Sequence, residues 1–163
     1  MNKKRILFVC MGNICRSPAA EAIMKKVITE NNLDDNIEVD SAGTIDYHTG
    51  ETADPRMIWF AKNRGYKIDS IARQFDLQND FTQFDYIVTM DNENYEDIRS
   101  LDIHNNYQSK IFRMVDFCNS CNSTGIPDPY YNEHDGFERV LDMLEDATEG
   151  LLKKVTDDIK QQN

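Results

Sequence analysis

Apolar residues follow two different spacings along this chain. Short continuous apolar runs are typical of strands buried on both faces of a sheet, whereas apolar residues spaced three or four positions apart indicate helices. The two patterns alternate, which favours an α/β fold in which a parallel sheet has helices on both faces. The four expected strands cover residues 6–11, 37–41, 85–90 and 110–112.

Four stretches have helical spacing, and three of them begin at a residue that suits a helix start. Ser17 suits an N-cap and Pro18 the first helical position, so we expect the first helix there. Pro55 and Asp91 open the next two helices. The last helix carries one apolar stripe, about six turns long, from Phe137 to Ile159.

Composition narrows the class of protein. The 163 residues, 40% of them apolar, fit a single globular domain over residues 1–163. The apolar run at residues 6–11 is too short for a signal peptide or a membrane span, so we expect a cytoplasmic protein without a membrane partner. The net charge of −11 repels phosphate backbones, so we expect no nucleic-acid partner. Any phosphate-binding site on this chain must therefore be a local region of positive charge, an exception to the negative surface.

One loop supplies that exception. A Cys-x5-Arg-Ser motif joins the first strand to the first helix, where backbone amides and the helix N-terminus can surround an anion. Gly12 and Asn13 tolerate the positive φ that such a curl needs, and Arg16 adds a bidentate donor. The predicted phosphate-binding loop around Cys10 and Arg16 consists of Met11, Gly12, Asn13, Ile14, Cys15 and Ser17.

The same field favours an ionised sulfur. A Cys10 thiolate that faces a bound phosphate could attack phosphorus in line and form a phosphocysteine, which water then hydrolyses. Arg16 and the loop amides would stabilise the charge on the transferring group. Because the loop supplies the positive charge, we expect no metal and no cofactor.

A second loop offers a proton donor for the leaving group. Ligands of parallel sheets bind at the carboxyl ends of the strands, where the loops after the first and fourth strands lie. The later loop holds Asp128 between two prolines that stiffen it. We predict Asp128 as the general acid, with Tyr130 and Tyr131 forming a wall for an aromatic ring.

These motifs resemble the low molecular weight protein tyrosine phosphatase family over nearly the whole chain. The resemblance implies a four-stranded parallel sheet in a flavodoxin-like, phosphotyrosine phosphatase I-like three-layer sandwich. It also implies hydrolysis of phosphotyrosine in protein substrates and of small aryl phosphates, with inorganic phosphate or vanadate as inhibitors. The segments that carry the resemblance are residues 9–18, 40–44, 72–74, 84–91 and 127–131.

The resemblance also suggests roles for individual residues. Asn13 and Ser41 would hold the loop in shape, and Ser17 would donate to the Cys10 sulfur and help it leave. Cys15 would pair reversibly with Cys10 under oxidation, although it could equally be a small core residue. Tyr47 would line the substrate cleft, or it could be an ordinary surface residue.

Other functions on the same fold stay open at this stage. Thioredoxin-coupled arsenate reductases share the loop but relay a disulfide through further cysteines, for which Cys118 and Cys121 are the candidates. Protein arginine phosphatases carry a threonine just before the Cys-Arg pair, where this chain has Ile14. A non-catalytic phosphate-binding module would lack the cysteine, the arginine or the acidic loop. We expect Cys118 and Cys121 to be reduced thiols, because a chain of this length can build a core and shows no signal peptide. One C-x-x-C is a weak zinc signal, and a redox pair is the alternative.

Overall fold

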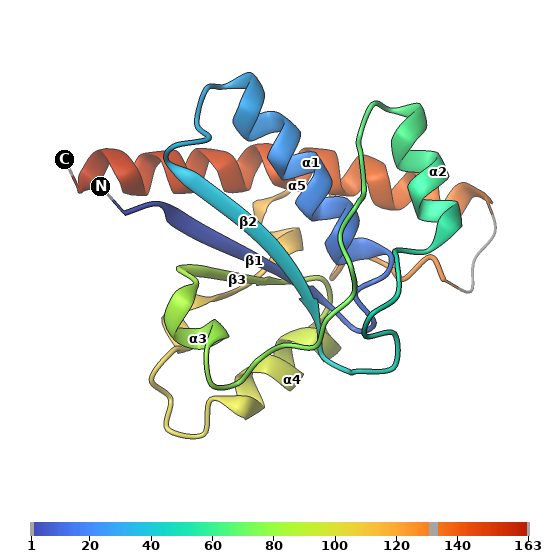
Figure 1. Cartoon of the computed structure of the whole chain (residues 1–163). Helices are drawn as coiled ribbons and strands as arrows, with labels where there is room; N and C mark the ends of the chain where they lie inside the picture. Colours follow the sequence, from blue (N-terminus) through green and yellow to red (C-terminus); the bar gives the residue numbers. More distant parts are fainter. Residues whose placement is uncertain (1, 131–133, 163) are drawn as a thin grey trace.

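The molecule has three layers, with a parallel sheet in the middle (Figure 1). The structure is a computed structural model that describes residues 2–130 and 134–162. The strands lie in the order β2-β1-β3-β4, and all three neighbouring pairs are parallel. The four-stranded parallel sheet predicted from the sequence is therefore confirmed. The strands are β1 (Lys4–Cys10), β2 (Ile37–Gly43), β3 (Tyr86–Thr89) and β4 (Ile111–Arg113).

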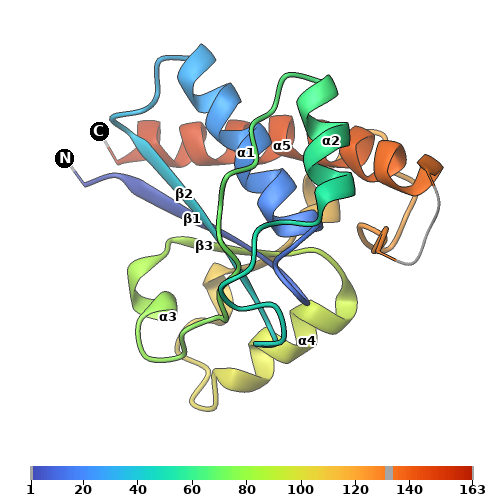
Figure 2. The ribbon, with the colours of Figure 1, turned by 45° about the vertical axis from the view of Figure 1, so that its right-hand side comes forward.

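Helices cover both faces of this sheet, as Figure 1 and the turned view in Figure 2 show. On one side lie α1 (Arg16–Glu30), α2 (Pro55–Asn63) and the long α5 (His134–Gln161). On the other side lie the short α3 (Asp80–Gln83) and α4 (Asn92–Leu101). Two 3₁₀ turns flank β4, namely η1 (Gln108–Lys110) and η2 (Met114–Phe117). Within the described part of the chain, no helix has the length and apolarity to cross a bilayer.

The strand β1 is buried on both faces, as its continuous apolar run predicts. Ile6 and Phe8 point into the core formed with α1, α2 and α5. Leu7 and Val9 point into the smaller core beneath α3 and α4. All four side chains have no exposed surface. This two-sided burial fixes the end of β1, and therefore Cys10, within the molecule.

The start of α1 differs from the sequence prediction. The helix begins at Arg16 with Cys15 as its N-cap, so Ser17 and Pro18 lie inside the first turn. The reason is chemical: the Ser17 hydroxyl bonds to neighbouring side chains instead of capping the helix. The short α3, η1 and η2 were not predicted, because three or four residues cannot display a helical period.

Candidate active site

The loop of residues 10–17 connects the carboxyl end of β1 to the first turn of α1. Cys10 is the last residue of the strand and Arg16 the first of the helix, and only 3% and 2% of their surfaces are exposed. Asn13 has a φ of 58°, in the left-handed region that asparagine tolerates better than most residues. The loop is therefore a tight curl inside the protein.

Neighbouring segments hold the outer side of this curl. Three of its carbonyl oxygens accept hydrogen bonds from the chain that follows β2, which satisfies these buried acceptors. The bonds run from Thr44 N to Cys10 O (2.9 Å), from Ile45 N to Met11 O (3.1 Å) and from Asp54 N to Ile14 O (2.8 Å). Because these carbonyls point outward, the loop can turn its amides towards the inside of the curl.

Gly43 brings β2 against the loop more closely than any other residue type could. A Cβ atom at this position would lie 2.7 Å from Met11 O and 3.2 Å from Asn13 N. Both are backbone atoms, which cannot move aside without moving the loop. The Ala42-Gly43 end of β2 thus sets the position of the curl.

The Cys10 sulfur has one close polar neighbour on its own loop. Ser17 Oγ lies 3.0 Å from Cys10 Sγ. Asn13 Nδ2 donates to Ser17 Oγ at 2.8 Å, and Asn13 Oδ1 accepts from the Arg73 amide at 3.0 Å. Asn13 thereby links the loop to the segment that follows α2.

Arg16 is buried among three acceptors that come from two loops, the one after β3 and the one before α5. Its Nη1 donates to Asp91 Oδ2 at 2.6 Å and to Ile126 O at 2.9 Å, and its Nη2 lies 3.6 Å from Asp128 Oδ2. Burial lowers the pKa of Arg16, but Cys10, Asp91 and Asp128 outweigh it and raise the pKa above its ordinary value. The guanidinium is therefore charged and fixed in direction.

Asp128 owes its position to the residue two places before it. Ile126 is fully buried, and its amide donates to Met90 O at 2.7 Å while its carbonyl accepts from Arg16. Beyond it, Asp128 Oδ1 accepts from the Tyr130 amide at 3.0 Å. About a third of the Asp128 side chain is exposed. The carboxyl group therefore stands at the border between Arg16 and solvent.

These groups open into one cleft of about 270 Å³. Its floor is formed by the 10–17 loop, and its sides come from the segment after β2 and from the loop that holds Asp128. The lining residues are Cys10, Met11, Gly12, Ile14, Cys15, Arg16, Ile45, Tyr47, His48, Asp128 and Tyr130. A cysteine sulfur, a guanidinium and a carboxyl group thus meet in a cleft that is otherwise largely apolar.

Aromatic rings stand at the rim of this cleft. Tyr47 is 79% exposed and packs edge-on against His48, whose Nδ1 lies 2.6 Å from Glu51 Oε2. The Tyr130 ring lies 6.3 Å from the His48 ring, and the Tyr130 carbonyl is held by Arg56 Nη2 at 2.9 Å. Tyr131, the other predicted wall residue, lies outside the described residues.

The two remaining predicted residues have different surroundings. The Ser41 hydroxyl donates to Glu21 Oε1 of α1 at 2.6 Å, so this hydrogen bond joins β2 to α1. Cys15 is a free, buried thiol that lines the cleft beside Cys10. Burial first, and then the charges of Asp54 and Cys10, raise the pKa of Cys15 well above its ordinary value.

Sequence reasoning did not identify several neighbours of the site. Asp91 pairs with Arg16, and Ile45 and His48 line the cleft. A signal for Asp91 was present: it follows the third strand at the edge of the sheet where Cys10 ends the first. His48 had no such signal, because its place depends on the course of the polar segment after β2.

Fold and site together define a class: a three-layer α/β protein with a cysteine–arginine loop at the carboxyl edge of its parallel sheet. The chain belongs to the low molecular weight phosphotyrosine protein phosphatase family, whose sequence profile matches residues 5–162. A Synechocystis protein that bears the family's name is 46% identical over 148 residues, which cover 91% of this chain and 94% of the relative.

Solved structures agree with this placement. A protein tyrosine phosphatase from Entamoeba histolytica, crystallised with Hepes in its active site, superposes with a TM-score of 0.92 at 51% identity. The match covers 95% of this chain and 98% of that one. A Drosophila arginine phosphatase is also similar, with a TM-score of 0.85 at 32% identity, over 91% of this chain and 96% of that one.

Proposed function

We propose that this chain hydrolyses phosphotyrosine in proteins, with Cys10 as the covalent nucleophile. The observation that carries the proposal is the cleft in which Cys10, Arg16 and Asp128 meet above one loop. Membership of a family of phosphotyrosine phosphatases supports the reaction class, a phosphoric monoester hydrolysis. In this proposal residues 1–163 act as one catalytic domain. The cytoplasmic location expected from the sequence stays a prediction.

In the first step the Cys10 thiolate attacks phosphorus and the tyrosine oxygen departs. The loop amides that face the curl, together with the charged Arg16, would bind the equatorial oxygens of the transferring group. To reach them, the guanidinium keeps its place against Asp91 and Ile126 and offers its remaining donors to the cleft. Asp128 would protonate the leaving oxygen, which a tyrosinate needs because its conjugate acid has a pKa of about 10.

In the second step water attacks the phosphocysteine and the sulfur leaves as a thiolate. Asp128, now deprotonated, would accept a proton from that water, and Ser17 Oγ would donate to the departing sulfur at 3.0 Å. Products are inorganic phosphate and the restored thiolate. Inorganic phosphate and vanadate should therefore bind the same curl as inhibitors, and no metal or cofactor enters the proposed steps.

The rim residues favour an aryl substrate over phosphoarginine. Tyr47 and Tyr130 could hold a phenyl ring between them, and Ile14 and Ile45 add apolar surface to the cleft. The similarity to a Drosophila arginine phosphatase makes the comparison necessary. Peptides of one sequence that carry phosphotyrosine or phosphoarginine should differ in kcat/KM by at least about tenfold in favour of tyrosine; equal values, or a preference for arginine, would contradict the substrate assignment.

The arsenate reductase alternative needs a thiol that can take over a disulfide from the loop. Cys118 and Cys121 are bonded to each other, and the cavity that Cys121 lines is not the cleft of Cys10. This arrangement favours the phosphatase. A thioredoxin-dependent arsenate assay tests it, since turnover that is lost on Cys118→Ser or Cys121→Ser would overturn the ranking.

The covalent role of Cys10 has its own test. Cys10→Ser should still bind vanadate or phosphate, because the loop amides and Arg16 remain, but should release no phosphate from an aryl phosphate. The wild-type activity should be unchanged by EDTA and abolished by vanadate. Measurable turnover by Cys10→Ser would exclude the covalent route, and loss of activity with EDTA would show that a metal is required.

A further inference from the structure

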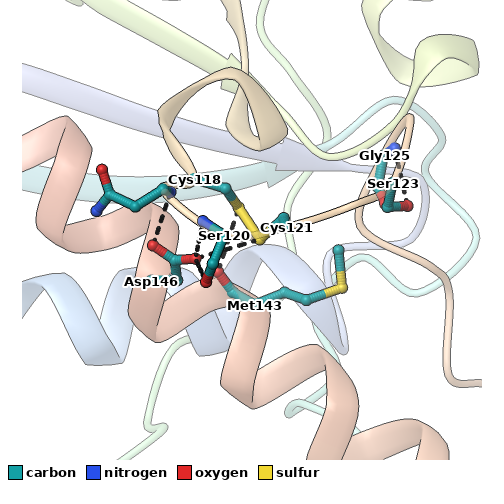
Figure 3. Close-up of a disulfide and its surroundings, with 8 residues drawn as sticks. Cys118, Ser120, Cys121, Ser123, Gly125, Met143 and Asp146 are labelled. Carbon is teal, nitrogen blue, oxygen red and sulfur yellow. Dashed lines mark hydrogen bonds between the residues drawn. A yellow bond between two sulfur atoms is a disulfide. The ribbon is translucent and has the colours of Figure 1, made fainter.

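Cys118 and Cys121 lie at the start of the segment that leads to Asp128, and the proposed reaction does not use them. Figure 3 shows their sulfurs joined in a disulfide beside α5. The Cα atoms are 5.4 Å apart, within the usual range for a disulfide. The expectation of two reduced thiols is therefore corrected, because η2 and the following turn bring the two sulfurs together. Residues 118–121 are called the cysteine turn below.

One face of α5 is shaped to receive this turn. Met143, Asp146 and Gly150 are spaced three and four residues apart, which places them on the same side of the helix. A Cβ atom at Gly150 would lie 2.0 Å from Phe117 O, so the backbone before the turn rests directly on the helix. The absence of a side chain at Gly150 permits this close approach.

Asp146 binds the turn from the helix side (Figure 3). Its Oδ1 accepts from the Asn119 amide at 2.8 Å, and its Oδ2 accepts from the Ser120 amide at 3.0 Å and from Ser120 Oγ at 2.9 Å. The amides of Asn119 and Ser120 hold the pKa of Asp146 below its ordinary value. The closed turn is therefore matched to one carboxylate on α5.

We propose that Cys118 and Cys121 form a reversible disulfide site, separate from the cleft, which tightens the segment leading to Asp128 against α5. The disulfide holds the amides of Asn119 and Ser120 in the direction of Asp146, so the closed turn and its contact with α5 stabilise each other. The effect on catalysis rests on the proposed role of Asp128, whereas the disulfide itself does not.

The surroundings of the sulfurs indicate how the bond forms and breaks. Cys121 lines a cavity of about 300 Å³, so a small disulfide can reach it. The Cys121 thiolate attacks that disulfide, forms a mixed disulfide and releases one small thiolate. The Cys118 thiolate then attacks the Cys121 sulfur and releases the second. Two protein thiols and one small disulfide thus become one protein disulfide and two small thiols, and an excess of small thiol reverses the exchange.

Both sulfurs lie near oxygen atoms that accept hydrogen bonds and would repel the negative charge of a thiolate. These surroundings therefore favour the uncharged disulfide over two free thiolates. Cys121 Sγ lies 3.6 Å from Asp146 Oδ2, and Cys118 Sγ lies 3.8 Å from Met143 O. The two sulfurs and the Asp146 carboxylate could also hold a soft cation, because their ligand atoms lie within 4.8 Å of one another. Against a metal, both oxygens of Asp146 already accept hydrogen bonds from the turn.

The turn connects to the catalytic loop through a short, ordered stretch. Ser123 Oγ bonds to Gly125 O at 2.7 Å, and Gly125 packs against Asp91, which pairs with Arg16. Ile126 follows, with its hydrogen bonds to Met90 and Arg16. The segment between η2 and Asp128 is therefore held at two places, the cysteine turn and Ile126. Opening the cysteine turn leaves only Ile126 to hold the segment, so we expect a moderate effect on the position of Asp128 and on kcat/KM.

The first test measures the disulfide itself and does not depend on activity. Wild-type protein is equilibrated with graded ratios of oxidised and reduced glutathione, its thiols are alkylated, and tryptic peptides are weighed. The Cys118–Cys121 peptide separates from the Cys10–Cys15 peptide, because Arg16 and Arg113 are cleavage sites. We expect one defined ratio at which half the pairs are closed. For Asp146→Asn this ratio should be about tenfold more oxidising, equivalent to about 1.4 kcal/mol. Pairs that stay reduced throughout, or no shift in Asp146→Asn, would overturn the site.

The second test asks whether the turn acts through Asp128. Cys118→Ser/Cys121→Ser removes the bond, and Asn122→Ala is the control in the same loop. The double variant should lose on the order of twofold to tenfold in kcat/KM on phenyl phosphate, a small part of the roughly 10²–10⁴-fold that a general acid contributes. It should keep its kcat/KM on p-nitrophenyl phosphate, whose leaving group needs less protonation. Equal losses on both substrates, or none, would contradict the coupling to Asp128.

A metal site would give a different result. If reduced wild-type protein binds one Zn²⁺ and the Cys118–Cys121 peptide is thereby protected from alkylation, the cysteines are ligands and the redox proposal is wrong. Cys118→Ser is the control, since it should bind no zinc in that case. We expect full alkylation of the reduced pair whether or not Zn²⁺ is added.

Discussion

At the scale of single residues, the Ser17 hydroxyl lies within hydrogen-bonding distance of the Cys10 sulfur, where the proposed chemistry takes place. Asn13 Nδ2 can only donate, so Ser17 Oγ accepts its bond. The Ser17 proton is then left for Cys10 Sγ at 3.0 Å or Ala42 O at 3.5 Å, and the shorter contact favours the sulfur. The asparagine thus directs the hydroxyl towards the atom that must leave in the second step.

Ser17→Ala should therefore slow the breakdown of the phosphocysteine. Hydrogen bonds to charged groups contribute about 1.5–3 kcal/mol, so kcat should fall roughly tenfold to a hundredfold. Rapid-mixing kinetics with p-nitrophenyl phosphate should show a clear initial burst followed by a slower steady state. Ser100→Ala, near the C-terminal end of α4, is the control and should behave like the wild type. An unchanged kcat in Ser17→Ala would remove Ser17 from the mechanism.

A second prediction at the residue scale concerns Gly43, whose lack of a side chain leaves room for the backbone of the loop. Gly43→Ala places a Cβ against Met11 O and Asn13 N, so the loop must move and kcat/KM should fall by at least about tenfold. Gly50→Ala is the matched control: it has a φ of 89° but open space around it. It should cost about 1–2 kcal/mol of stability and leave kcat/KM unchanged. Similar kinetics for both variants would show that β2 does not position the loop.

At the scale of elements, the helices and strands with a clear apolar period could be predicted from the sequence. β1, β3 and α5 carry long buried patterns, and their predicted and observed bounds agree within a few residues. The predicted start of α1 was wrong because the Ser17 hydroxyl bonds to Cys10 and Asn13, and a rule based on local N-cap preferences does not consider such partners. The loop with Cys10 and Arg16 could be predicted since its residues are adjacent, whereas the Asp91–Arg16 pair joins residues 75 positions apart. The Cys118–Cys121 bond depends on how η2 rests on α5.

The first turn of α2 connects stability to the shape of the cleft. Asp54 caps the helix by accepting from the Arg56 amide at 2.8 Å, and it also binds the Arg56 guanidinium at 2.8 Å. Arg56 in turn holds the Tyr130 carbonyl. Burial raises the pKa of Asp54, but the hydrogen bonds from Arg56 outweigh it and hold the pKa below its ordinary value.

This pKa shift determines the pH dependence of an Asp54→Ala variant. Because the folded pKa is lowered, Asp54 stabilises the fold above its unfolded pKa of about 3.9, and this contribution disappears as the pH falls through the folded pKa. Asp54→Ala should therefore be less stable than the wild type by about 1 kcal/mol at pH 7. The difference should shrink as the solution becomes more acidic than pH 4. Urea unfolding at several pH values measures it, and a difference that grows in acid would contradict the assignment.

At the scale of the whole molecule, the net negative charge opposes the binding of phosphate at the proposed site. The chain has 29 acidic and 18 basic residues, and its net charge of −11 repels a phosphorylated substrate before the loop can attract it. Arg16, nearly all of it buried, acts only at short range. The residues around a substrate phosphotyrosine should therefore influence binding through the overall field.

Ionic strength should separate two peptides that differ only in their flanking charges. Between about 0.01 and 0.15 M salt the screening length falls from about 30 Å to about 8 Å. The kcat/KM of a phosphotyrosine peptide with acidic flanks should rise, and that of a peptide with basic flanks should fall, each on the order of twofold to tenfold. Steady-state assays on both peptides measure this. If the kcat/KM values of both peptides changed with salt in the same way, the electrostatic field of the net charge would not extend to the cleft.

The covalent step at Cys10 is tested most directly by trapping the phosphorylated enzyme. Wild-type protein is mixed with p-nitrophenyl phosphate, stopped within milliseconds by alkaline denaturant, digested, and analysed by mass spectrometry. We predict one phosphoryl group on the peptide of residues 6–16, located at Cys10 and absent from Cys10→Ser. A phosphoryl group on another residue, or turnover by Cys10→Ser without any phosphorylated peptide, would contradict the account.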